Sequence, residues 1–206
     1  MNLTKIRIEP FSLMICIIIL GAWVISASYH DLSIFETQKS RLLITFGAAN
    51  GELLLAGDYW KLITSQFVHV RFPHMLFNVA VIYCIGAALE EKYGPSIFLL
   101  AYFLSGTVGQ YASVTSYPLL VTSGASQALC GIVGSFLVLN LFTEHKKKFA
   151  LYLALVFVLV QIFLDVYFSG KIKAGHYMGF LSGVLFGLIY GVKTRFFLGG
   201  SRIIKD

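Results

Sequence analysis

The chain has 206 residues, of which 57% are hydrophobic and only 13% are charged, and its mean hydropathy is +0.79. A soluble domain usually has about 25% charged residues, because its surface has to be hydrated. This composition argues against a soluble enzyme, a disordered tail and a nucleic-acid-binding module. The net charge of +6 would suit nucleic acid, so the positions of the basic residues have to decide.

Six apolar stretches follow one another along the chain, and each membrane-spanning helix needs about 20 apolar residues. We expect spans at about 11–29, 74–89, 97–114, 126–142, 149–168 and 175–192. Lys5 and Arg7 precede the first stretch, but no small-residue cleavage site with a soluble domain follows it. We therefore interpret it as a retained helix rather than a signal peptide. The predicted fold class is an all-α membrane protein, with residues 1–206 forming one bundle of six transmembrane helices.

The basic residues in short loops predict the orientation, because such residues concentrate on the cytoplasmic side. With the N-terminus inside, ten basic residues lie inside: Lys5, Arg7, Lys92, Lys146, Lys147, Lys148, Lys193, Arg195, Arg202 and Lys205. Six lie outside: Lys39, Arg41, Lys61, Arg71, Lys171 and Lys173. Both termini are thus predicted to be cytoplasmic, and the positive charge is explained without nucleic acid.

The longest connection, residues 31–73, contains apolar patches that are interrupted by Gly47, Gly51 and Gly57. This pattern predicts an ordered, partly membrane-embedded segment rather than a free linker. Its residues Tyr59, Trp60 and Lys61 suit the headgroup zone, where amphipathic side chains collect.

The fourth span begins at Ser126, after a loop at 116–122 that is too apolar to lie comfortably in water. Residues 126–142 form about 25 Å of helix, which is shorter than the bilayer core of about 30 Å. We therefore expect the loop to dip into the membrane and the helix to begin below the surface, beside protein or a water-filled cavity. Ser126 is well placed there as a nucleophile. The alternative is a serine that only caps its helix.

The sixth span has His176 near its outer end, followed by glycines at intervals of four: Gly179, Gly183, Gly187 and Gly191. Such a stripe allows a very close approach of another helix. His176 lies near the same face, so it should point into the protein. Gly131 and Gly134 of the fourth span offer a matching surface, which would bring His176 to Ser126. The alternative is a buried histidine with a structural role.

The second span begins with His74 and Asn78, which share one helix face. Both side chains can donate hydrogen bonds, as an oxyanion hole requires. The alternatives are an interfacial histidine and an asparagine that holds two helices together.

Three acidic residues near the span ends are interpreted as structural or solvated. Glu90 and Glu91 end the second span, where we expect them to be solvated or paired with Lys92. Asp165 lies one turn from the outer end of the fifth span, near Lys171 and Lys173.

Other intramembrane protease chemistries find no support in the sequence. There is no H-E-x-x-H motif for zinc, and Asp165 is the only acid well inside a span, so an aspartyl dyad is absent. The cysteines form no C-x-x-C pair, lie in apolar runs and suit neither a disulfide framework nor a zinc site: Cys16, Cys84 and Cys130. A serine nucleophile needs a nearby base, and Ser126 with His176 is the remaining pair.

Several motifs, in order, resemble the rhomboid family of intramembrane serine proteases over residues 46–191. They are Gly57-Asp-Tyr-Trp60-Lys61-Leu-Ile-Thr64, His69 with His74-x-x-x-Asn78, Gly86 with Glu90 and Gly94, Gly124-Ala125-Ser126 with Gly131 and Gly134, and His176-x-x-Gly179-x-x-x-Gly183. Each motif alone is weak, but the ordered set is specific.

The resemblance implies a six-helix protease that needs no metal or cofactor and acts on other transmembrane proteins within the lipid bilayer. It implies Ser126 as the nucleophile, His176 as the general base, and His74 and Asn78 with the Ser126 N–H as oxyanion donors. It also implies a structural role for His69, which hydrogen-bonds the first loop, and no acidic third member. Gly124, Gln127, Gly179 and Gly183 would lie around the site. The short chain suggests a minimal bacterial or archaeal member in the inner membrane.

Three residues depart from the family pattern. Gln127 stands where glycine is usual, and it could reshape the substrate pocket, donate to the oxyanion or block the site. Cys130 replaces an aromatic ring on which the histidine would stack, and Lys61 replaces an arginine and loses its bidentate fork. An alternative is therefore a catalytically silent rhomboid-like protein that binds transmembrane helices. A small transporter ranks last, since the sequence has no internal repeat and no charge relay.

Overall fold

The computed structural model describes residues 9–142 and 148–197, and the elements in these ranges are helical. The long helices are α1 (Pro10–Tyr29), α4 (Phe72–Val81), α5 (Ala87–Tyr93), α6 (Pro95–Ser116), α7 (Ser126–Leu139), α8 (Lys148–Ser169) and α9 (Ala174–Phe197). A π-helical segment, Ile82–Gly86, joins α4 to α5, and a 3₁₀ turn, Asn140–Phe142, follows α7. Five helical segments are long and apolar enough to cross a bilayer, and Ser126–Phe142 is a shorter apolar sixth. The predicted all-α membrane bundle is confirmed.

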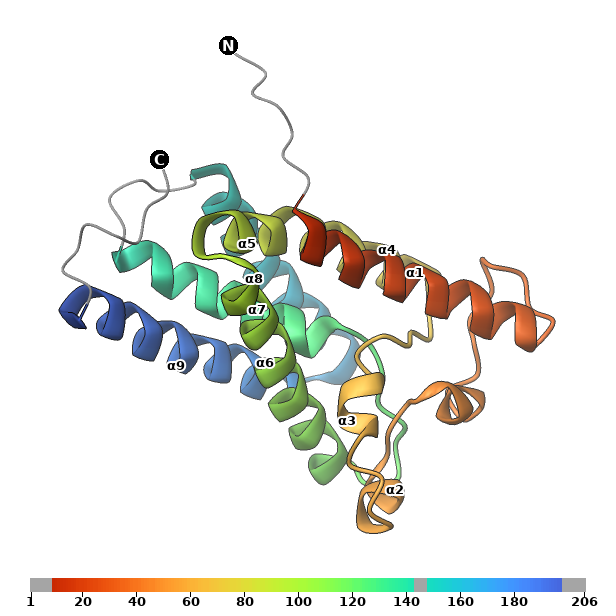
Figure 1. Cartoon of the computed structure of the whole chain (residues 1–206). Helices are drawn as coiled ribbons and strands as arrows, with labels where there is room; N and C mark the ends of the chain where they lie inside the picture. Colours follow the sequence, from red (N-terminus) through yellow and green to blue (C-terminus); the bar gives the residue numbers. More distant parts are fainter. Residues whose placement is uncertain (1–8, 143–147, 198–206) are drawn as a thin grey trace.

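Helix α7 lies at the centre of the bundle, where it packs on α9, α6 and α8 (Figure 1). Thirteen of its fourteen residues are buried. A helix that is apolar all round and covered on every side needs no contact with lipid. Protein therefore surrounds this short helix, including its first turn at Ser126.

The contact between α7 and α9 is backbone against backbone. A methyl group on Gly183 would overlap the Gly131 carbonyl oxygen, and one on Gly134 would lie 2.6 Å from the Phe180 carbonyl oxygen. The Ser135 hydroxyl donates to the Gly183 carbonyl at 3.0 Å. The glycine stripe of α9 thus faces α7.

The long connection between α1 and α4 is folded into three short helices: η1 (Leu42–Phe46), α2 (Gly51–Leu55) and α3 (Lys61–Thr64). Its backbone pairs with the segment that precedes α7. Ala49 and Thr122 exchange backbone hydrogen bonds of 3.1 and 2.7 Å, and the Gly51 N–H donates to the Pro118 carbonyl at 2.8 Å. The connection therefore supports the approach to Ser126.

Lys61 is buried within the protein, and its predicted place in the headgroup zone stays a prediction. Its side chain is buried, with 6% exposed, and its amine donates to the Ile44 carbonyl at 2.8 Å while lying 4.6 Å from the Trp60 ring centroid. The Ile44 carbonyl also accepts from the Gly47 N–H at 3.2 Å, so the amine adds a second donor at the end of η1. Trp60 and Tyr59 are exposed.

Glu90 is buried, so the expectation of a solvated carboxylate is wrong. Its oxygens accept hydrogen bonds from the backbone N–H of Phe11 at 3.0 Å and from the Ser12 N–H at 2.7 Å and hydroxyl at 2.6 Å. The free N–H groups and the dipole of a helix N-terminus favour a carboxylate. Glu90 therefore caps α1 from a distant part of the chain.

The predicted orientation stays a prediction. Of the basic residues behind it, Lys5, Arg7, Lys146, Lys147, Arg202 and Lys205 lie outside the described residues.

Candidate active site

Ser126 and His176 lie in direct contact, although they come from different helices. Ser126 is the first residue of α7 and His176 lies in the first turn of α9, and 2% and 7% of these residues are exposed. The Ser126 Oγ is 2.8 Å from the His176 Nε2. The close packing of α7 against α9 permits this approach.

The turn before Ser126 depends on Gly124, whose φ of +116° lies in the left-handed region. Its N–H donates to the Ser65 carbonyl at 2.8 Å, and its carbonyl accepts from the Gln110 Nε2 at 3.0 Å. A methyl group at this position would also lie 3.3 Å from the His74 Cε1. Any side chain here would strain the backbone that presents Ser126.

His69 links the loop before α4 to this turn. Its Nε2 accepts a hydrogen bond from the Ala125 N–H at 3.2 Å, one residue before Ser126. Burial lowers the pKa of His69 to about 3, with a smaller contribution from the charge of His74. The ring is therefore neutral at physiological pH, which leaves Nε2 free to accept. The resemblance implies that His69 is structural, and in this protein its bond to the turn before Ser126 is the one from the Ala125 N–H.

His74 and Asn78 lie beside His69 on α4. The Asn78 Nδ2 is 2.9 Å from the His69 Nε2 and 3.4 Å from the His74 Nε2. Asn78 is buried and His74 is half-buried, with its ring next to Gly124. The structure thus gathers these three side chains at the turn that carries Ser126.

Gln127 is buried between α6 and the start of α9, where its Cβ and Cγ fill the space left by Gly109 and Gly175. Its Oε1 lies 3.2 Å from the Ser126 Oγ and 3.4 Å from the Gln110 Nε2. Its side chain therefore offers the Ser126 hydroxyl a second acceptor.

Asp165 lies against His176, a contact that the sequence analysis did not predict. Its carboxylate oxygens lie 2.8 and 3.0 Å from the His176 Nδ1, and 1% of the residue is exposed. The expected proximity to Lys173 is present too, because the Lys173 N–H donates to Asp165 at 3.1 Å. The signal in the sequence is an acidic residue inside an apolar span. In the structure the buried residues of α8 are Ala150, Ala154, Phe157 and Asp165, and this helical spacing places Asp165 on the inward face.

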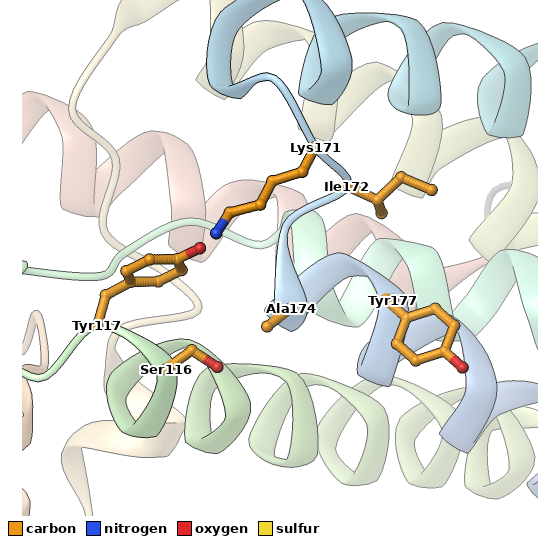
Figure 2. Close-up of a pocket in the computed structure, with 6 residues that line it drawn as sticks. All are labelled: Ser116, Tyr117, Lys171, Ile172, Ala174 and Tyr177. Carbon is orange, nitrogen blue, oxygen red and sulfur yellow. The ribbon is translucent and has the colours of Figure 1, made fainter.

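A pocket of about 470 Å³ lies next to this site, between the end of α6 and the connection from α8 to α9 (Figure 2). It is lined by Ser116, Tyr117, Lys171, Ile172, Ala174 and Tyr177. The Lys171 amine points across it to the Tyr117 ring, 5.1 Å from the centroid. Ala174 and Tyr177 lie two residues before and one residue after His176, so the pocket adjoins the first turn of α9.

Comparisons with known proteins agree with these motifs. The Rhomboid domain family matches residues 56–193. The chain is 35% identical over 146 residues to the "Putative rhomboid protease YdcA" of Bacillus subtilis, which covers 68% of each protein. It is 33% identical over 168 residues to "Rhomboid-like protease 3" of Toxoplasma gondii, covering 78% of this chain and 60% of that protein.

A third relative is longer. The chain is 29% identical over 148 residues to "Rhomboid protease GluP" of Bacillus subtilis, covering 70% of this chain but 29% of that protein. The chain therefore spans less than two thirds of the length of this relative and of the Toxoplasma protein.

Proposed function

Because the chain belongs to the rhomboid family, we propose that it is an intramembrane serine protease. It hydrolyses peptide bonds in or near the transmembrane segments of other membrane proteins. The observation that carries the proposal is the contact of 2.8 Å between the Ser126 Oγ and the His176 Nε2. A serine nucleophile requires a base at this distance.

In the first step His176 removes the hydroxyl proton of Ser126 through Nε2. The Ser126 Oγ then bonds to the carbonyl carbon of the substrate, whose oxygen becomes negatively charged. Collapse of this intermediate breaks the C–N bond, and His176 returns the proton to the leaving amine. Water then attacks the acyl carbon and gives one proton to the His176 Nε2. The bond from the acyl carbon to the Ser126 Oγ breaks, His176 returns the proton to this oxygen, and the carboxylic acid leaves.

The oxyanion is stabilised by the Ser126 N–H, His74 and Asn78. The Asn78 amide has two protons, one for His69 at 2.9 Å and one directed at His74 at 3.4 Å. The longer contact is the weaker one, so this proton and the His74 ring are the groups free to turn to the substrate. Removing one oxyanion donor typically costs about 10²- to 10³-fold in kcat.

The substrates are transmembrane proteins, and the protein itself is a multi-pass integral membrane protein. Its predicted location is the inner membrane of a bacterium or archaeon. Since Ser126 begins a helix that is shorter than the other spans, the cleaved bond lies below the outer surface of the bilayer. The substrate helix therefore has to unwind locally to expose that bond.

Reconstituted protein and a model transmembrane substrate test the proposal. The unmodified protein is expected to cleave, whereas Ser126→Ala and His176→Ala lose cleavage by at least about 10³-fold. Ser182→Ala is the matched control, because Ser182 lies on α9 and bonds its own helix at the Gly179 carbonyl. Equal cleavage by the unmodified protein and Ser126→Ala would refute the assignment.

The alternative is a catalytically silent rhomboid-like protein that only binds transmembrane helices. The observation that suggests it is Gln127 next to Ser126, where the family usually has glycine. A serine-directed fluorophosphonate separates the two. Labelling of Ser126 that is lost in His176→Ala supports the protease. Absence of labelling and cleavage, with retained binding of the substrate helix, supports the silent protein.

A further inference from the structure

We propose that Asp165 is the third member of the active site, a positioning residue that fixes the tautomer and orientation of His176. This rests on the proposed protease function, and it adds an acid to what the family resemblance implies is a two-residue system. Asp165 lies near the end of α8 and His176 lies in the first turn of α9, and the connection 170–173 separates the two helices.

The hydrogen bonds around His176 assign its tautomer. Both Asp165 oxygens lie within 3.0 Å of Nδ1, and a carboxylate only accepts. Nδ1 therefore carries the proton, and Nε2 is left bare toward the Ser126 hydroxyl. The Gln161 Nε2 also lies 3.1 Å from Nδ1, but a protonated Nδ1 cannot accept. The Gln161 amide instead donates to the Asp165 Oδ1 at 3.1 Å.

Asp165 is itself held in place from both sides. Gln161 donates to Oδ1 from one turn earlier in α8, and the Lys173 N–H donates to Oδ2 from the connection to α9. The Lys173 amine lies 3.9 Å from Oδ1. These donors fix the orientation of the Asp165 carboxylate independently of its contact with His176.

Asp165 is buried, and burying a carboxylate costs free energy unless it has partners. Most of α8 is exposed on the outside of the bundle, and Asp165 is the one charged residue on its buried face. An ionisable group inside a membrane helix is expensive and is retained where it has a partner. If Asp165 served only to hold the connection, it would need Lys173 but not His176. Its shortest contact is the one to His176, at 2.8 Å.

The role follows from the proton transfer. When Ser126 gives its proton to Nε2, the ring becomes an imidazolium with protons on both nitrogens. Asp165 stays ionised, accepts from the Nδ1–H throughout and stabilises the positive charge that appears. No proton passes to the carboxylate. Asp165 also supplies support for the ring at a site where Cys130 stands in place of an aromatic residue.

The kinetic test is Asp165→Asn, which preserves the size of the side chain. Its amide can present a donor to Nδ1 and so favours the unproductive tautomer. Cleavage of the model substrate is expected to lose about 10²- to 10⁴-fold in kcat with KM changed by less than about twofold. Asp31→Asn is the matched control, since Asp31 is an exposed aspartate outside the bundle. An unchanged kcat, or a loss confined to KM, would overturn the proposal.

A second measurement does not depend on activity. In protein with ¹⁵N-labelled histidine, a proton shared between Nδ1 and a carboxylate gives a strongly downfield resonance. We expect it in the unmodified protein and in Ser126→Ala, and we expect its loss in Asp165→Asn and His176→Gln. Its presence in unmodified protein that cleaves no substrate would refute the protease but leave the Asp165–His176 pair standing. Its absence from the folded, unmodified protein would refute the pair.

Discussion

The Ser126 hydroxyl has one proton and two possible acceptors, because the Gln127 side chain competes with His176 for it. The His176 Nε2 lies at 2.8 Å and the Gln127 Oε1 at 3.2 Å from the Ser126 Oγ. In the proposed mechanism, only a hydroxyl proton directed at His176 leads to catalysis. We therefore expect that in a fraction of the molecules the Ser126 hydroxyl donates to the Gln127 amide and not to His176.

Gln127→Leu removes this second acceptor and keeps the bulk that fills the space beside Gly109. Gln110 retains partners, because its amide donates to the Gly124 carbonyl and its oxygen accepts from Thr122. A typical hydrogen bond is worth about 0.5–1.5 kcal/mol, so we expect fluorophosphonate labelling of Ser126 to accelerate by about two- to tenfold. A slower rate would mean that the Gln127 amide assists the reaction.

His69 makes the stability of the protein dependent on pH. Its pKa is lowered from 6.5 to about 3 in the folded protein, so between these values the unfolded chain binds the additional proton. The stabilisation is complete above pH 6.5 and is lost as the pH falls toward 3. The melting temperature in detergent should therefore fall between about pH 7.5 and about pH 5.

His69→Gln is the control for this titration, because its carbonyl can accept from the Ala125 N–H without binding a proton. We expect a smaller decrease of the melting temperature over the same range. An equal decrease in both proteins would assign the effect to other groups.

Single residues also mark the limit of what the sequence could predict about the site. Ser126, His176, His74 and Asn78 could be singled out because a polar side chain in an apolar span is conspicuous. Asp165 was conspicuous too, but its nearness to Lys171 and Lys173 suggested a surface role. Whether a side chain near a helix end turns outward or inward depends on the packing of the next helix.

The packing of α7 on α9 fixes the distance between Ser126 and His176. Gly183→Ala places a methyl group on the Gly131 carbonyl, which belongs to backbone and cannot move aside. Overpacking of this kind costs about 1–3 kcal/mol, and displacing α9 also separates His176 from Ser126. We expect a lower melting temperature and at least about tenfold less cleavage.

Gly21→Ala is the matched control, because no atom lies within 4 Å of a methyl group at that position in α1. It should be neutral or stabilise by up to about 1 kcal/mol. Similar losses in the two variants would contradict the special role of the glycine stripe.

The elements were largely predictable from runs of apolar residues, whereas the bonds that join them were not. The second span extends from Phe72 to Tyr93, beyond the apolar core at 74–89, and a π-helical segment at Ile82–Gly86 joins its two α-helical parts. The Glu90 cap on α1 joins residues 78 positions apart. A contact at that separation leaves no periodic trace in the sequence.

The two ends of α8 provide a test of the orientation of the whole molecule. Lys148 begins the helix and Lys171 follows its end, and both are exposed. The distribution of basic residues predicts that Lys171 faces outward and Lys148 faces the cytoplasm.

In intact cells producing a Cys84→Ser background, a membrane-impermeant maleimide should label Lys171→Cys and not Lys148→Cys. Lysed cells should label both, which controls for accessibility. Labelling of Lys148→Cys alone in intact cells would reverse the predicted topology.

Because Ser126 and His176 meet only where α7 packs on α9, their contact can form only late in the synthesis of the chain. Ser126 is synthesised 50 residues before His176, and α8 has to be made and inserted between them. Until α9 docks against α7, Ser126 has no contact with His176. For the proposed protease, this order prevents a growing chain from attacking neighbouring membrane proteins, or itself, before its own assembly is finished.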